Sequence, residues 1–282
     1  MKETGRVRME QNKSTLSRAL AMDGQISVAV VDATSLVREA AKRHSLKEGS
    51  LKALAKTLMV SCYLCGWLKG EKSSLTVSLT ADGDFGRVSV LGDGSLNLRG
   101  YVQNKNCVNG KLGRGTLTVV RDDGEGLPFA GSVPLVSEEI EENFSAYFRE
   151  SEQLQTGIVL SVITNRDEVV HAGGVFLQAL PFASDEARAI IDNAAAKVKG
   201  YLDAGEYGKI FKVFGIEEVQ SHETKFACRC SAERVESLIL SMGEESAFSL
   251  LEEEGRISVH CEYCNTDYEF GKERIRELFK KA

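Results

Sequence analysis

Four cysteines in the C-terminal part of the chain form two close pairs. One residue separates Cys228 from Cys230, and two residues separate Cys261 from Cys264. Zinc takes four tetrahedral ligands and binds thiolates well, so this spacing predicts one four-thiolate site that holds one zinc ion. A site with four cysteine ligands has no position for a reactive water. We therefore expect a structural or redox role for the metal, and no hydrolytic chemistry.

A second Cys-x-x-Cys motif, Cys62 and Cys65, permits two interpretations. Such a pair can be a redox dithiol or half of a metal site. Here it lies on an apolar stripe of helical period over residues 51–65, and no matching pair is evident. Cysteines on such a stripe behave as small hydrophobic residues, so we expect both to pack in the core. Cys107 stands in a polar stretch, and no role is predicted for it.

The composition of the 282-residue chain is that of an ordinary globular protein, with 43% hydrophobic and 27% charged residues. No apolar run reaches the roughly 18 residues of a membrane helix, and residues 1–18 lack the apolar segment of a secretory signal. We expect a cytoplasmic protein with reduced thiols and no membrane association. The net charge of −6 disfavours a nucleic-acid partner, because phosphate binding requires clustered Lys and Arg.

The hydrophobic pattern predicts an α+β fold whose N-terminal domain, residues 1–183, is rich in sheet with packed helices. After a polar lead, an apolar run at 26–31 predicts a strand. Helical spacing then follows from residue 36 and again over 51–65. Residues 74–80 alternate between apolar and polar, which is typical of a strand, and start a meander. The other predicted elements of this domain are strands at 87–91, 96–102, 115–120, 129–136, 158–164 and 169–180, and a helix at 138–149.

The hydrophobic pattern of residues 184–218 predicts an amphipathic helical linker. One apolar stripe runs from Ala187 to Val198 and ends near Gly200, and a second patch ends at Gly215. Helices this short are unstable alone, so each needs a partner surface.

The zinc end, residues 219–282, is predicted to contain helices beginning at about 231 and 244 and two strands around the second cysteine pair. Its few apolar residues make a marginal core. Bound zinc, worth about 10 to 16 kcal/mol in zinc peptides, would hold it folded.

Several motifs together resemble the thirty-three-kilodalton heat shock protein family, the redox-regulated holdase chaperones, over nearly the whole chain. The matching stretches are Cys228-x-Cys230-Ser231-x-Glu233-Arg234, Val259-x-Cys261-x-x-Cys264-Asn265 with Tyr268 and Phe270, Tyr147-Phe-x-x-Ser151-Glu152-Gln153-x-x-Thr156, and Gly173-Gly174 through Gln178-x-Leu180-Pro181. The departures are a longer polar N-terminus, Phe182 where glycine is usual, and the additional cysteines Cys62, Cys65 and Cys107.

The resemblance implies a cytosolic chaperone without enzymatic activity that binds unfolding proteins and prevents their aggregation. It implies zinc on Cys228, Cys230, Cys261 and Cys264 in the inactive reduced form. It also implies activation by oxidation, with zinc release and disulfides Cys228–Cys230 and Cys261–Cys264, and a homodimer as the active form.

The residues suggest how oxidation would act. Loss of zinc is expected to unfold the small domain and to deprive the linker of its docking surface, which exposes apolar side chains to clients. The predicted client-binding residues are Ile190, Ile191, Val198, Ile210, Phe211 and Phe214.

Two other functions stay open at this point. One is a constitutive binding module with a structural zinc. The other is a thiol oxidoreductase that uses Cys62 and Cys65 or the C-terminal pairs. No catalytic residue is predicted, because the sequence has no visible triad, activating histidine or phosphate-binding loop.

Overall fold

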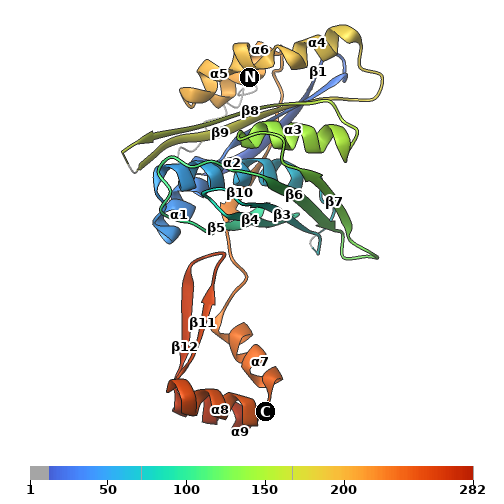
Figure 1. Cartoon of the computed structure of the whole chain (residues 1–282). Coiled ribbons are helices and arrows are strands. Elements are labelled where there is room, and N and C mark those ends of the chain that lie inside the picture. The colour runs from blue at the N-terminus through green and yellow to red at the C-terminus, as the bar shows by residue number, and fades with distance from the viewer. Residues whose placement is uncertain (1–12, 71, 167, 282) are drawn as a thin grey trace, which may run out of the picture. The chain divides into compact units, whose positions relative to one another are not determined.

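The computed structural model describes residues 13–70, 72–166 and 168–281. The predicted α+β fold is confirmed (Figure 1). The chain divides into two compact units, Met1–Phe226 and Ala227–Ala282. The predicted linker is thus part of the first unit, and the second unit begins just before the first cysteine of the predicted site.

A ten-stranded sheet, in the order β7-β6-β3-β4-β5-β10-β1-β2-β9-β8, forms the framework of the first unit. All neighbouring strands are antiparallel except β10 and β5, which are parallel. The strands are β1 (Ser14–Ala21), β2 (Ile26–Asp32), β3 (Ser74–Ala81), β4 (Arg87–Asp93), β5 (Asn97–Val102), β6 (Gly115–Asp122), β7 (Phe129–Pro134), β8 (Thr156–Asn165), β9 (Glu168–Ala179) and β10 (Gln220–Phe226).

Strands β1 and β10 were not predicted from the sequence. β10 joins the two halves of the sheet: Thr224 pairs with Ser14 of β1, and Lys225 pairs with Asn97 of β5. The expected start of the zinc end, residue 219, therefore lies before a strand of the first unit. Thr224 is the one fully buried residue in β10, so this strand lacks the apolar alternation that reveals a strand in a sequence.

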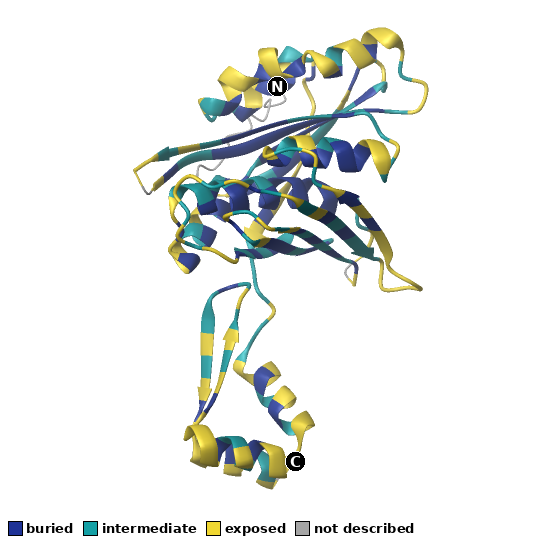
Figure 2. Ribbon diagram, viewed as in Figure 1, coloured by how far each residue is buried: buried dark blue, intermediate teal, exposed yellow. Residues whose placement is uncertain are grey.

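Helix α2 (Glu48–Cys65) lies between the two halves of the sheet and is buried along most of its length (Figures 1 and 2). It packs against β4 and β5 of one half and against β8 and β9 of the other. Helices α1 (Thr34–His44) and α3 (Ile140–Glu150) complete this core. A helix that contacts apolar surface all round needs no polar face, which explains why α2 is apolar on nearly every side.

The outer face of the β8-β9-β2-β1 half carries the linker helices α4 (Asp185–Asp192), α5 (Ala194–Asp203) and α6 (Tyr207–Val213). Strand β2 serves both sides of the sheet: Val28 and Val30 face the linker, while Ala29 and Val31 face the main core. The single helix predicted over 184–200 is in fact two helices. They separate at Asn193, whose backbone (φ −100°, ψ 4°) leaves the helical region.

The second unit contains a two-stranded sheet and helices around a small core. Its elements are α7 (Ala232–Met242), α8 (Glu244–Glu254), β11 (Ile257–Cys261), β12 (Thr266–Phe270) and α9 (Lys272–Lys281). The predicted helices and strands are present, and α9 was not predicted. Its one deeply buried side chain among those described, Ile275, provides too weak a pattern. Across both units, no helix in the described ranges has the length and hydrophobicity needed to cross a membrane.

Candidate metal and redox site

The four C-terminal cysteines converge in the second unit, with their sulfur atoms all within 4.8 Å of one another. Cys228 and Cys230 lie in the irregular segment before α7. Cys261 ends β11, and Cys264 lies in the turn that leads to β12. Residues more than thirty positions apart in the chain are thus brought together by the fold, as the spacing predicted.

Local backbone chemistry positions each pair. Ser231 caps α7, because its hydroxyl accepts a hydrogen bond from the amide of Arg234, and this fixes the end of the Cys-x-Cys segment. In the other pair, the carbonyl of Cys261 accepts hydrogen bonds from the amides of Cys264 and Asn265. Asn265 adopts the left-handed conformation (φ 55°) that such a tight turn requires and that Asn tolerates.

The sulfur geometry fits a four-thiolate metal site. Cys228 Sγ lies 3.8 Å from Cys261 Sγ, and Cys230 Sγ lies 3.2 Å from Cys264 Sγ. Zn–S bonds of about 2.3 Å in a tetrahedron place the sulfur atoms about 3.8 Å apart. Both observed distances are well above the roughly 2.05 Å of a disulfide bond, and all four cysteines are free. The residues present therefore match the donor set and the number of ligands that zinc prefers. The Cys228–Cys261 distance equals the tetrahedral spacing, whereas the Cys230–Cys264 distance is shorter and would have to lengthen around a bound ion.

Two hydroxyl groups lie next to these sulfurs. Tyr268 donates a hydrogen bond to Cys230 Sγ at 3.1 Å, and Thr266 Oγ1 lies 3.3 Å from Cys264 Sγ. Burial raises the pKa of Cys230, but hydrogen bonds, that of Tyr268 first, outweigh it and lower this pKa to about 7. Burial is also the main reason that the pKa of Cys228 and that of Cys264 are raised. Hydrogen bonding thus favours the thiolate at Cys230.

The other Cys-x-x-Cys motif has a different environment. Cys62 and Cys65 are fully buried in α2, as the sequence predicted. Burial raises the pKa of Cys62 to about 12 and also raises that of Cys65. Cys107 is only partly buried, and burial followed by the charge of Asp84 raises its pKa. These three thiols are therefore poor nucleophiles at neutral pH, which disfavours an oxidoreductase built on Cys62 and Cys65.

The predicted client-binding residues lie on the linker helices and are covered. Ile191, Val198, Ile210 and Phe211 are at most 3% exposed, and Ile190 and Phe214 pack at the margin of the same cluster. Their partner is the outer face of the sheet, including Val28, Val175 and Leu177. The docking surface of the linker thus lies within the first unit itself.

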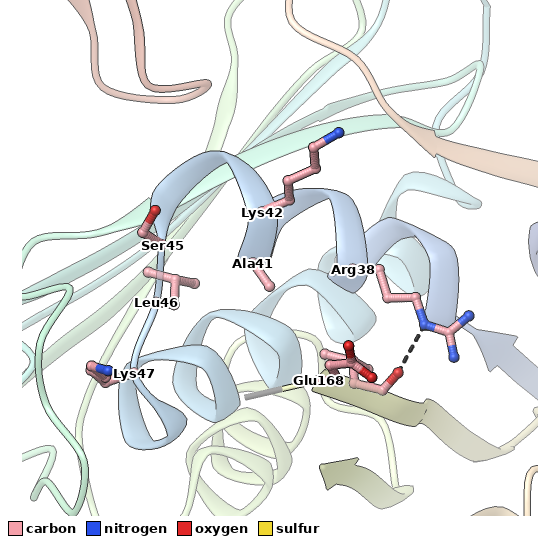
Figure 3. A pocket seen from close by; sticks show the side chains of 8 residues that line it. Arg38, Ala41, Lys42, Ser45, Leu46, Lys47 and Glu168 are labelled. Carbon is pink, nitrogen blue, oxygen red and sulfur yellow. Dashed lines mark hydrogen bonds between the residues drawn. The ribbon is translucent and has the colours of Figure 1, made fainter. Parts of the chain in front are cut away.

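A cavity of about 610 Å³ lies between α1, the α1–α2 connection and the start of β9 (Figure 3). Its rim carries Arg38, Lys42 and Lys47, with Glu168 as the acidic member. Arg38 already donates to the carbonyl groups of Val169 and Val170. None of the lining residues is among those that the sequence singled out.

Comparison with known proteins agrees with this architecture. The sequence model of the Hsp33 protein family matches residues 14–271. The 33 kDa chaperonin of Lachnoclostridium phytofermentans is 32% identical, with 94% of this chain and 98% of that protein covered. The 33 kDa chaperonin of Bacillus cereus strain B4264 is 34% identical, with 95% of this chain and 99% of that protein covered. The chain belongs to the Hsp33 family.

The crystal structure of the 33 kDa chaperonin from Thermotoga maritima superposes with a TM-score of 0.82 at 26% identity. It covers 95% of this chain and 98% of that protein, so the similarity includes both units. Membership of this chaperone family confirms the expectation of a chaperone rather than an enzyme, with unfolded proteins as the class of partner. The cluster of four cysteines could hold a metal ion and is compatible with redox regulation.

The sequence did not reveal the role of Tyr268 beside Cys230. Its position four residues after Cys264 was visible, but the contact with Cys230 crosses 38 positions of the chain and depends on the register of the β11–β12 hairpin.

Proposed function

We propose that the protein is a redox-regulated holdase that is inactive in its reduced, zinc-bound form and is activated by oxidation of its four C-terminal cysteines. The observation that carries this proposal is the convergence of four free thiols in a unit with a small apolar core. A large buried apolar surface under the linker supplies what a holdase must expose.

One zinc ion would be held by Cys228, Cys230, Cys261 and Cys264. When bound, zinc would keep these side chains as thiolates and would add its binding energy to the stability of the second unit. The cluster around Val235, Ile239 and Leu251 is small, so this unit would depend on that contribution.

Oxidation by a peroxide would proceed on the thiolates in pairs. The first sulfur forms an S–O bond as hydroxide leaves, and the second sulfur then displaces hydroxide to form the disulfide. Two thiolates thereby lose two electrons, and two protons convert the two hydroxides to water. We infer disulfides Cys228–Cys230 and Cys261–Cys264 from the family resemblance. Proximity in the reduced form does not choose the pairing, because all four sulfurs lie within 4.8 Å.

Tryptic mapping of oxidised protein tests this pairing, because Arg229 and Arg256 separate the relevant peptides. The proposed pairing joins peptide 226–229 to peptide 230–234 and leaves peptide 257–272 with an internal disulfide. A bridge between peptide 257–272 and either of the other two would contradict it.

The linker would be the surface that changes. Its helices are held on the sheet by burial and by a few polar contacts: Tyr207 with Thr34, Asp203 with Ser161, and Arg188 and Asp192 with Gln155. The connection to the second unit runs along β10, which ends two residues before Cys228. Unfolding of the second unit would loosen β10 first and then the linker. Release would expose Ile190, Ile191, Val198, Ile210, Phe211 and Phe214, together with the sheet face beneath them.

Hydrogen exchange of reduced and oxidised protein tests the linker directly. Loss of protection in α4 to α6 and β10 after oxidation is expected, and equal protection in both states would contradict the role of the linker. Ile210→Asp, which places a charge in the buried docking surface, should release the linker in reduced protein. Lys212→Asp is the matched control, because Lys212 is exposed on the same helix.

Light scattering of a thermally unfolding client tests the function itself. Suppression of aggregation by oxidised but not by reduced protein is the expected result. Equal suppression by both forms would indicate a constitutive zinc-stabilised module, and turnover of a thiol substrate would indicate an oxidoreductase. The same preparations allow the remaining parts of the proposal to be checked: a homodimer as the active form, a cytoplasmic location, and no binding of nucleic acid or membranes.

A further inference from the structure

We propose that Tyr268 is a positioning residue that restrains oxidation of the Cys230 thiolate and so sets how readily the switch responds to peroxide. The proposal rests on the function proposed above. It concerns the rate of the switch, and the carrying observation is the hydrogen bond from the Tyr268 hydroxyl to Cys230 Sγ at 3.1 Å.

The fold holds this hydroxyl in place. Tyr268 lies on β12, opposite Val259 of β11, and its half-buried ring packs against the core of the second unit. The hairpin carries the Cys261–Cys264 pair, whereas the acceptor Cys230 lies on the segment before α7. The side chain therefore connects the two arms that supply the thiols, and its ring cannot turn away without leaving the apolar cluster.

A hydrogen bond to a thiolate withdraws charge from the sulfur and fixes the direction of its lone pairs. Reaction with peroxide requires the opposite, since a sulfur lone pair must attack an oxygen atom as hydroxide leaves. The bond to Tyr268 therefore makes attack by Cys230 less favourable. Bound zinc would keep Cys230 as a thiolate with or without this hydrogen bond. Removal of the hydroxyl alone should therefore make the zinc-bound thiolate a better nucleophile while the ring continues to pack.

Thr266 offers an internal comparison. The Cys264 thiol donates a hydrogen bond to Thr266 Oγ1 at 3.3 Å, and the Thr266 hydroxyl donates to the carbonyl oxygen of Cys264 at 3.5 Å. Because this hydroxyl donates to a carbonyl group rather than to the sulfur, it should restrain the sulfur less than Tyr268 does. We therefore assign the main restraint to Tyr268.

The test compares wild-type full-length protein with Tyr268→Phe, both loaded with zinc. A chromophoric chelator reports zinc release in two conditions, with hydrogen peroxide and with the chelator alone. Hydrogen bonds to charged groups correspond to a factor of about ten or more in rate, so Tyr268→Phe should release zinc about tenfold faster with peroxide. Release to the chelator alone should change less than about twofold, because the ring and the four ligands remain.

Two controls separate positioning from packing. Thr266→Val should accelerate peroxide-driven release by a smaller factor than Tyr268→Phe. Tyr201→Phe removes a hydroxyl from a tyrosine of the first unit and should change neither rate. With cobalt in place of zinc, Tyr268→Phe should also shift the sulfur-to-metal charge-transfer band, a change that loss of packing alone would not produce.

Equal acceleration in both conditions, or a Tyr268→Phe protein that fails to bind zinc, would show that Tyr268 is structural and would overturn the proposal. Unchanged rates in both conditions would overturn it as well. Failure of the proposed function gives a different result, because wild-type protein would then bind no zinc or would retain it in peroxide.

Discussion

The chain contains two Cys-x-x-Cys motifs with the same spacing and opposite surroundings. Cys62 and Cys65 lie in the interior of α2, between the two halves of a large sheet. Cys261 and Cys264 lie on a turn of a two-stranded sheet, next to a second pair of thiols. The first pair is fully buried in the main hydrophobic core, and the second lies in a cluster of four partly exposed or buried thiols with hydroxyl groups beside it.

This comparison shows that the surroundings decide what a thiol pair can do. Burial raises the pKa of Cys62 to about 12, so its thiol stays protonated at neutral pH. In the cluster, burial also raises the pKa of Cys264, but Cys230, which belongs to the neighbouring pair, has its pKa lowered to about 7 because hydrogen bonds outweigh the effect of burial. A thiolate is the form that binds metals and reacts with oxidants. The same motif therefore packs within the core of one unit and contributes to a cluster of four thiols in the other.

The largest effect is expected from removal of one cluster thiol. Cys261→Ser leaves three thiolates, so the protein should lose most of its zinc and with it much of the roughly 10 kcal/mol that a structural zinc contributes. Hydrogen exchange should then be fast throughout α7 to α9 and unchanged in α2. Zinc content and peptide-resolved exchange of the purified protein provide the measurement.

The buried motif provides the matched control for that experiment. Cys65→Ala should retain full zinc content and should lower the free energy of unfolding of the first unit by about 1 kcal/mol, as for loss of one methylene-sized group. Zinc loss in Cys65→Ala would mean that the two motifs are not independent, and the comparison would fail.

The pH dependence of stability should distinguish the buried thiols from the rest of the protein. The Cys62 thiol titrates near 8.5 in an unfolded chain and at a pKa of about 12 in the folded protein. Between these values the unfolded state has lost the proton that the folded state keeps. Stability is therefore complete below about pH 8.5 and falls by about 1.4 kcal/mol per pH unit above it.

Urea unfolding at pH 8, 9 and 10 measures this slope in wild type and in Cys62→Ala. The variant should be less stable at pH 8, and the difference should shrink or reverse by pH 10, because alanine has no proton to lose. Other groups that titrate in this range contribute equally to the pH dependence of stability in wild type and in Cys62→Ala. Parallel curves would show that burial does not disfavour the Cys62 thiolate.

Gly92 tests how tightly the buried pair is packed. A Cβ atom added at Gly92 would overlap Cys65 Sγ, whereas the next neighbour, Leu98 Cγ, is 3.6 Å away. Gly92→Ala should therefore lower the free energy of unfolding by about 1 to 3 kcal/mol through overpacking. In Gly92→Ala/Cys65→Ala the new methyl group occupies the space of the lost sulfur, so the double variant should be more stable than Gly92→Ala alone.

Gly92→Ala/Cys62→Ala is the control, because Cys62 is not among the close neighbours of that Cβ position. In this double variant the decreases in free energy of unfolding caused by Gly92→Ala and by Cys62→Ala should add. Rescue by Cys62→Ala would indicate a general relaxation of α2 rather than a specific contact with Cys65. Chemical denaturation of wild type, the three single variants and the two double variants under one condition is sufficient for this comparison.

The elements that the sequence predicted are those with a strong apolar pattern. The alternation of β3 identified that strand because one buried face produces a period of two, and α2 was identified by the density and helical spacing of its apolar residues. Strand β10 gave no such signal, since its neighbours β1 and β5 bind it through backbone groups while most of its side chains face solvent. The break at Asn193 was also missed, because the apolar spacing continues across it.

In the candidate site, the ligands could be predicted from the sequence, but the contacts around them could not. The four cysteines were identified from spacing, because two close pairs of thiols are a typical ligand set for zinc. The covered state of Ile210 and Phe211 follows from the sheet on which they pack, which the linker sequence does not contain. Tyr268 acquires its contact only when β12 pairs with β11 in the observed register.

The smallest effects are expected at two serines that make the same contact in different units. Ser184 caps α4 and Ser231 caps α7, each by accepting a hydrogen bond of 3.3 Å from the amide three residues later. Replacement of an N-cap serine by alanine costs about 1 kcal/mol. Each substitution should destabilise its own helix by the same free energy. Any difference between the two variants in exchange or zinc binding then reflects the surroundings of each helix.

The first unit has a large core, so loss of one N-cap hydrogen bond should not unfold it. Ser184→Ala should therefore only increase hydrogen exchange at the start of α4. In the second unit the core is small, so Ser231→Ala should shift zinc binding by about fivefold, the factor that corresponds to about 1 kcal/mol. Competition with a chelator measures the second effect and hydrogen exchange the first. If Ser184→Ala also weakened zinc binding, the two units would have to fold together, whereas an unchanged affinity in Ser231→Ala would mean that α7 does not limit the metal site.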